Sequence, residues 1–164
     1  MLKINTFESY TKDIIENEHF SLLKKDLHHG ITRYEHSMRV AHWTYKICNF
    51  FKFDNLKEIT RAALLHDFYI NEDLTIIGGP SALVEHPNVA LENSKKYFEI
   101  NELQEDIIKH HMFPCTKDLP ESKEAFLVSL VDKGVSTFEM IRYKAPLYAS
   151  IFLIFLFELV TVSR

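Results

Sequence analysis

Apolar residues recur at intervals of three and four along most of the chain, which is the spacing of one face of an α-helix. The clearest apolar stripe consists of Val40, Trp43, Ile47 and Phe50. Thr32 and Glu35 precede it with the spacing of a capping box, in which each side chain bonds the backbone of the other. The pattern predicts a helix from about Thr32 to Phe51, with this stripe buried.

Similar spacing predicts several more helices. They cover about residues 7–27, 55–68, 86–98, 101–112 and 122–141. Asn101 is a suitable N-cap, and His86-Pro87 has the form of a helix start because proline is favoured at the first helical position. Gly78-Gly79-Pro80 predicts an irregular loop within residues 69–85. With only 4 Gly and 5 Pro in 164 residues, the chain is expected to be all-α.

The C-terminal segment 145–162 is apolar except for Glu158. We therefore divide the chain into a domain over residues 1–143 and an apolar helix over 144–164. At about 17 apolar residues the segment lies at the short limit of a membrane span. Arg142 and Lys144 precede it, as expected if the domain faces the cytoplasm. Two predictions stay open: an anchor at the inner face of a membrane, or a helix buried in protein, as in a homodimer.

The charge and the cysteine content indicate which binding partners and which cellular compartment to expect. The net charge is -4 and Lys and Arg form no cluster, so no nucleic-acid partner is expected. Cys48 and Cys115 form no spaced motif, and the N-terminus is polar, without a secretory signal. We expect a cytoplasmic protein with free thiols.

Histidine and aspartate residues lie on or beside several of the predicted apolar faces. They are His36, His66, Asp67, His86, His110, His111 and Asp132. Burying two carboxylates and several imidazoles together is costly without partners. A divalent cation binds neutral imidazole and ionised carboxylate, and so removes that cost. The set predicts a site for Fe, Mn, Co, Ni or Zn, and the lack of thiolates argues against structural zinc.

The order of these residues resembles a known family pattern. His36 in TRYEHSMRV, His66-Asp67 in AALLHDFY and Asp132 in LVSLVDKG are similar to the H…HD…D pattern of the HD-domain superfamily of metal-dependent phosphohydrolases. The similarity covers roughly residues 32–138. It implies an HD-domain helical bundle in which the first metal is held by His36, His66, Asp67 and Asp132.

A second set of residues resembles family members that bind two metals. These are His86 in EHPNVALEN and the pair His110-His111 in IIKHHMFP. The resemblance implies that Asp67, the expected catalytic residue, bridges two ions. The second ion would be held by His86 and by one of the paired histidines. We prefer His111 over His110 by comparison with family members that carry a single histidine there.

The resemblance also implies a reaction. We expect hydrolysis of a phosphomonoester, phosphoanhydride or phosphodiester bond, in a small substrate such as a nucleotide, by a metal-bound hydroxide. Arg33, Arg39 and Lys133 adjoin ligand positions in sequence and are the expected phosphate-binding residues. The alternative is a metal-containing sensor that binds a nucleotide without cleaving it.

Two differences from the sequence motifs of other HD families bear on the substrate. Families that cleave cyclic dinucleotides have a Lys soon after the HD pair and a Gly-Tyr-Pro motif. Here Phe68-Tyr69 follows the pair and that motif is lacking, so this activity is not expected. The likeness is closer to small stand-alone bacterial HD proteins, including those that split dinucleoside polyphosphates.

Overall fold

The computed structural model describes residues 6–28, 31–74 and 81–162, and almost all of its regular structure is helical. The helices are α1 (Thr6–Ile15), α2 (Glu18–Ser21), α3 (Arg33–Phe50), α4 (Leu56–Leu65), α5 (Asn71–Leu74), α6 (Ser81–Tyr97), α7 (Glu102–His110) and α8 (Lys123–Val162), with a 3-10 turn, η1, at Leu22–Lys24. Strands β1 (Leu27–His28) and β2 (Ile31–Thr32) form a two-residue antiparallel pair. The predicted all-α class is confirmed.

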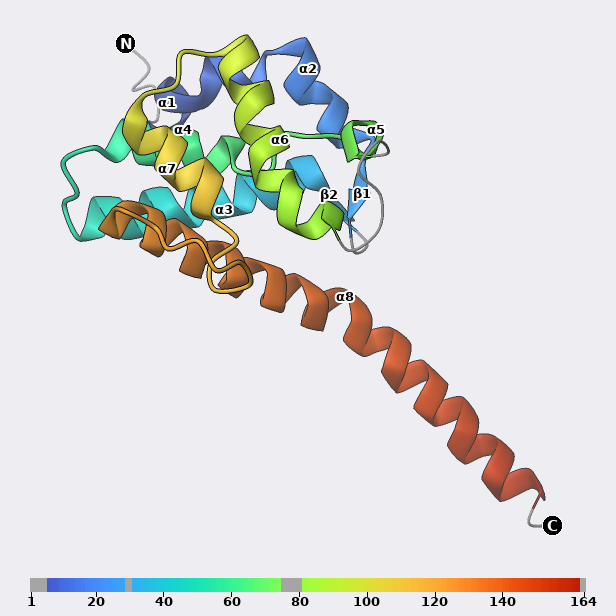
Figure 1. The fold of residues 1–164 in the computed structure, drawn as a ribbon. Helices are drawn as coiled ribbons and strands as arrows, with labels where there is room; N and C mark the ends of the chain where they lie inside the picture. Colours follow the sequence, from blue (N-terminus) through green and yellow to red (C-terminus); the bar gives the residue numbers. More distant parts are fainter. Residues whose placement is uncertain (1–5, 29–30, 75–80, 163–164) are drawn as a thin grey trace, which may run out of the picture.

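The helices form a bundle around α4 and α7, the two helices that carry much of the core (Figure 1). α3 packs against α4 and α8, and α7 packs against α4, α6 and α8. Leu64 and Leu65 of α4 and Ile107 and Ile108 of α7 are completely buried. Because α3, α4, α6, α7 and α8 meet here, residues far apart in sequence are brought together at their inner faces.

Two of the predicted helix starts are confirmed in atomic detail. Thr32 caps α3 through the backbone N–H of Glu35, and the Glu35 carboxylate accepts the backbone N–H of Thr32. Asn101 and Gln104 form the same reciprocal pair at the start of α7. Both boxes satisfy N–H groups that a helix start leaves without an internal partner.

Other predicted boundaries are wrong for local reasons. The expected helix over residues 7–27 breaks after α1, because the Asn17 side chain accepts the N–H groups of His19 and Phe20 and starts α2. His86-Pro87 does not begin a helix. α6 begins at Ser81, and Pro87 lies in its second turn, where it costs a backbone hydrogen bond without ending the helix. The loop predicted at residues 78–80 lies outside the described residues.

The apolar stripe predicted on α3 is only partly buried. Val40 is buried, whereas Trp43 is 51% exposed and Phe50 is 77% exposed. The buried face continues from Val40 to Thr44 and Cys48 at intervals of four. α3 has apolar residues on two faces, and spacing alone does not distinguish the inner face from the outer one.

Helix α8 continues without a break through the predicted boundary at residue 143 and reaches Val162. Its second half extends away from the bundle (Figure 1). Most side chains of residues 146–162 lie outside the described part of the structure. Over what is described, no helix combines the length and apolar character needed to cross a membrane.

Candidate metal centre

Six histidine and aspartate residues meet at the inner faces of five helices. His36 comes from α3, His66 and Asp67 directly follow α4, His86 comes from α6, His111 directly follows α7, and Asp132 comes from α8. All six are buried. They form three overlapping groups of three: His36, His66 and Asp67; His66, His111 and Asp132; and Asp67, His86 and His111. Within each group the potential ligand atoms lie within 4.8 Å of one another.

His66 presents a free ring nitrogen to the first half of this cluster. Its Nδ1–H donates to the Ala63 carbonyl at 2.8 Å, which leaves the lone pair on Nε2. That Nε2 is buried and has no hydrogen-bond partner among the described residues. It lies 3.7 Å from Oδ1 of Asp132 and 3.9 Å from Oδ2 of Asp67. A buried lone pair between two carboxylates is the arrangement that a cation would satisfy.

The second half is built around Oδ1 of Asp67. This oxygen lies 3.4 Å from Nε2 of His86 and 3.5 Å from Nε2 of His111, and within the described chain it makes no hydrogen bond. His111 donates its Nδ1–H to the Ile108 carbonyl, so its Nε2 also carries a lone pair. The two Nε2 atoms of His86 and His111 are 3.0 Å apart. The donor atoms therefore fit a divalent cation in both halves, with Asp67 shared between them.

The electrostatics keep the carboxylates ionised. Although burial would raise the pKa of Asp67 and Asp132, the neighbouring histidines hold both well below the ordinary value. Burial lowers the pKa of His86 to about 4, against the pull of Asp67. Burial also opposes the charged form of His36, but its bonds to Asp132 and Glu139 raise that pKa to about 10. Metal binding needs ionised carboxylates and neutral imidazoles, so a cation would displace the proton that His36 holds.

The adjacent histidines at the end of α7 face different partners. His111 faces Asp67 and His86, whereas Nδ1 of His110 lies 2.7 Å from the Asp106 carboxylate. Asp106 also accepts the backbone N–H groups of Glu121 and Ser122. His110 therefore belongs to a contact between α7 and the start of α8.

Arg33, predicted to bind phosphate, is buried and fully engaged. Its Nε pairs with Asp26 at 3.1 Å, its Nη1 donates to the Tyr69 hydroxyl at 2.5 Å, and the guanidinium stacks on the Tyr69 ring. Nη1 lies 3.7 Å from Oδ2 of Asp67, too far for a hydrogen bond. Its charge nevertheless adjoins the cluster. Asn71 also donates to Asp26 and closes this network.

Arg39 and Lys133, the other two predicted phosphate ligands, contact acidic residues of the site. Lys133 donates to Oδ2 of Asp132 at 2.7 Å and to the His111 carbonyl at 2.8 Å. Arg39 pairs with Glu139 at 2.7 Å. Both side chains are partly exposed. Contact with phosphate stays a prediction for all three basic residues.

Glu139 is a site residue that the sequence analysis missed. It is buried, and its carboxylate accepts the Nδ1–H of His36 at 2.8 Å while pairing with Arg39. A carboxylate that orients a histidine in this way is a frequent companion of metal sites. The available signal was its spacing: Glu139 lies seven residues, or two turns, after Asp132 on the same helix.

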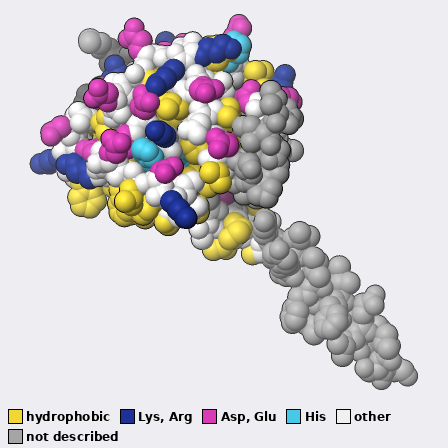
Figure 2. All heavy atoms as spheres, in the orientation of Figure 1, with side chains coloured by type: hydrophobic (Ala, Val, Ile, Leu, Met, Phe, Trp, Pro, Cys, Tyr) yellow, Lys and Arg dark blue, Asp and Glu magenta, His cyan; other side chains and the backbone are white. Residues whose placement is uncertain are grey.

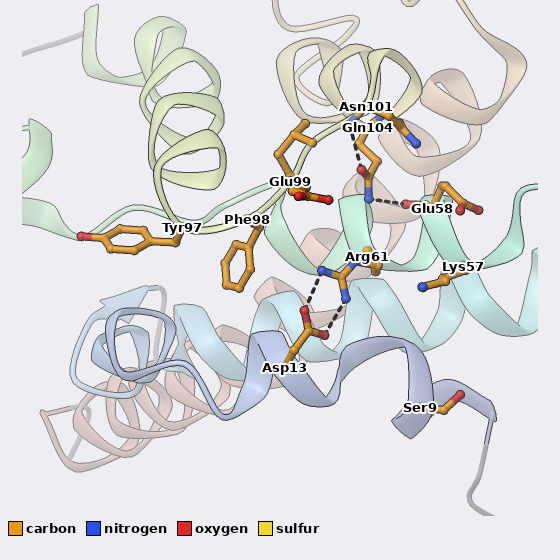
Figure 3. A pocket seen from close by; sticks show the side chains of 11 residues that line it. Ser9, Asp13, Lys57, Glu58, Arg61, Tyr97, Phe98, Glu99, Asn101 and Gln104 are labelled. Atoms are coloured by element: carbon orange, nitrogen blue, oxygen red, sulfur yellow. Dashed lines mark hydrogen bonds and ion pairs between the residues drawn. The ribbon is translucent and has the colours of Figure 1, made fainter.

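One cavity lies apart from the cluster and shares none of its six residues. It has a volume of about 660 Å³ and lies between α1, α4 and the start of α7 (Figure 3). In its wall Arg61 and Asp13 form a bidentate ion pair, with distances of 2.6 and 2.8 Å between the guanidinium nitrogens and the carboxylate oxygens. The cavity holds no second metal-ligand set in the described residues.

The helical bundle and its cluster define a protein with a candidate divalent-metal centre, and a comparison with family models gives the particular family. The HD-domain model matches residues 33–134, more than half of the chain. The chain therefore belongs to the HD-domain family. HD domains bind divalent metals and indicate a superfamily of metal-dependent phosphohydrolases. No curated protein and no solved structure gives a significant match.

Proposed function

We propose that this protein is a phosphohydrolase that uses two divalent metal ions to hydrolyse a small phosphorylated substrate, with nucleotides as the expected class. The observation that supports it most is the convergence of six buried histidine and aspartate residues. Their facing atoms include His66 Nε2 and Asp67 Oδ1, which have no hydrogen-bond partner among the described residues. Buried polar atoms without partners are costly, and a cation would satisfy them.

In this proposal His36, His66, Asp67 and Asp132 hold one ion, and Asp67, His86 and His111 hold the other. Bound ions supply hydroxide near neutral pH and offset charge on the phosphoryl group. The chain's own residues set the geometry. Ala63 and Ile108 carbonyls orient the rings of His66 and His111, Glu139 orients His36, and Lys133 holds Asp132.

The test combines metal content with turnover. Purified protein reconstituted with Mn or Fe is expected to hold about two equivalents and to release phosphate from at least one nucleotide or dinucleoside polyphosphate. Asp67→Ala should lose metal and all turnover, because it removes the shared ligand. Phosphate release by Asp67→Ala at the parent rate would disprove the mechanism. Metal without turnover over a broad nucleotide screen would favour a sensor.

The adjacent histidines provide a matched control. His111→Ala should lose about one metal equivalent, whereas His110→Ala should keep both ions because its ring faces Asp106 instead. Both substitutions remove a buried imidazole. If circular dichroism shows that the two variants are equally folded, a difference in their metal content cannot be due to unfolding. Metal loss from His110→Ala alone would contradict the assignment.

A further inference from the structure

An apolar groove lies between α3 and α8, outside the metal centre. Its volume is about 370 Å³. Its apolar lining consists of Trp43, Ile47, Val131, Gly134, Val135 and Phe138. Phe138 is 60% exposed, and Phe126, Leu130 and Ile141 of α8 are also exposed at intervals of three to eight residues along the helix. In Figure 2 hydrophobic side chains gather along the lower edge of the bundle and at the point where α8 leaves it. Exposed apolar surface of this extent is typical of an interaction site.

Among the described residues, nothing explains Gly134 in this groove. A glycine inside a helix destabilises it by about 1 kcal/mol relative to alanine. A Cβ at residue 134 would meet nothing within 4 Å, so no neighbour in the described structure requires glycine there. The missing side chain leaves space on the outer surface of α8, where a second helix could approach closely.

Helix α8 also carries an apolar segment that is expected to be buried against another surface. Residues 145–162 contain one charge, Glu158, and their backbone is helical to Val162. Ala145 and Leu153 are exposed, and the segment projects beyond the bundle (Figure 1). A helix that is apolar on all sides must be buried in protein or lipid. One chain thus has both an open groove and an apolar helical segment that projects from the bundle.

We propose that α8 pairs antiparallel with α8 of a second copy, so that the apolar segment of each fills the groove of the other. The groove is centred near Gly134 and the segment near Leu153, so the two-fold axis passes near Ala145. Such an arrangement is isologous, because the same surface of each copy forms the interface. It would cover the groove and the apolar segment of both copies. It also gives Gly134 a function, as the point of close approach.

The size of the contact is adequate for a stable dimer. A 40-residue helix is about 60 Å long and about 10 Å across, so one face offers on the order of 600 Å² per copy. Trp43 and Phe50 of α3 extend that surface. Stable interfaces bury about 600–1,000 Å² per partner. A membrane would cover residues 145–162 but would leave the groove and Gly134 unexplained.

The interface adjoins the metal centre at Arg39. Arg39 lines the groove and pairs with Glu139, which in turn orients His36. A helix seated in the groove would restrict Arg39 and so hold Glu139 in place.

Light scattering coupled to size-exclusion chromatography of the full chain tests the proposal. The parent protein is expected to be a dimer without detergent. Gly134→Arg should block close approach, and Phe138→Asp should raise the dimer dissociation constant by about 30-fold or more. Val84→Asp, at an exposed apolar residue on α6, should leave the dimer unchanged. Circular dichroism checks that each variant is folded.

Disulfide cross-linking tests the geometry. In a Cys115→Ser background, Ala145→Cys lies at the axis and should cross-link to its mate with copper phenanthroline and oxygen as the oxidant. Phe126→Cys should not, because the two copies of residue 126 would be about 55 Å apart. Cys48 is buried and should not interfere. A monomer, a dimer unaffected by both groove variants, or cross-linking at residue 126 alone would overturn the proposal. Monomers that float with phosphatidylcholine and phosphatidylglycerol vesicles would also overturn it, in favour of a membrane site.

Discussion

At the residue scale, the chemistry of the centre depends on which ring nitrogens are free. Backbone carbonyls accept the Nδ1–H groups of His66 and His111, and a carboxylate does the same for His36. Each bond directs the Nε2 atom inward. The candidate ligands could be found in the sequence because these histidine and aspartate residues lie on or beside apolar stripes. Glu139 could not, because a glutamate on a helix is usually solvated and only the packing of α8 on α3 buries it.

Glu139→Gln should weaken metal binding by about 10–100-fold, the usual effect of losing a partner that orients a ligand. The amide keeps the shape of the carboxylate but accepts the His36 N–H less strongly and pairs less well with Arg39. Titration calorimetry with Mn²⁺ gives the dissociation constant without reference to activity. Glu92→Gln, at an exposed residue of α6, is the control. An unchanged affinity in Glu139→Gln would show that its role is structural only.

At the element scale, the sequence predicted the helical class and the capping boxes but not every boundary. A capping box such as that of Thr32 determines where a helix begins when no stronger interaction favours another start. α6 begins before its apparent start at His86, and α8 passes through the expected boundary at residue 143, because backbone hydrogen bonding and packing can outweigh proline and composition signals. The inner face of α3 was ambiguous because two rows at helical spacing start from Val40, one through Trp43 and Ile47 and the other through Thr44 and Cys48.

The contact between α7 and α8 predicts a pH effect on stability. Burial would raise the pKa of Asp106, but bonds from Ser122, Glu121 and His110 lower it below 3.8. A carboxylate with a lowered pKa stabilises the fold above its unfolded pKa, and that contribution is lost as pH falls through the folded value. Asp106→Asn should therefore cost about 1.5–3 kcal/mol at neutral pH and less at acidic pH.

Urea denaturation at neutral pH and at successively lower pH, down to values below the ordinary carboxyl pKa, measures the effect. Asp13→Asn is the matched control, because Arg61 also lowers the pKa of Asp13 but the Asp13 side chain is 58% exposed. Solvent screening should keep its cost below about 1 kcal/mol. Equal costs for the two variants, or a cost for Asp106→Asn that does not fall with pH, would contradict the assigned role of Asp106.

At the scale of the whole molecule, the cluster joins helices that are distant in sequence. Its potential ligands come from α3, α6 and α8 and from the residues that follow α4 and α7, so a bound ion would cross-link most of the bundle. Without the ion, the charge of Asp67 is offset by Arg33 at 3.7 Å, and that of Asp132 by its bonds to His36 and Lys133. The metal site is thus expected to stabilise the fold as well as support chemistry.

Removal of metal should lower the melting temperature measurably. An ion at 100 times its dissociation constant stabilises the folded state by about 2.7 kcal/mol, because it binds the assembled ligands and not the unfolded chain. For a chain of 164 residues this corresponds to a shift of about 5–10 °C. Scanning calorimetry with and without EDTA, at constant protein concentration, gives the value. Asp67→Ala lacks the shared ligand and should show no response to EDTA. The same EDTA shift in Asp67→Ala and the parent would mean that the stabilising ion binds elsewhere, and an EDTA-insensitive parent that holds two ions would mean that the bundle is stable without them.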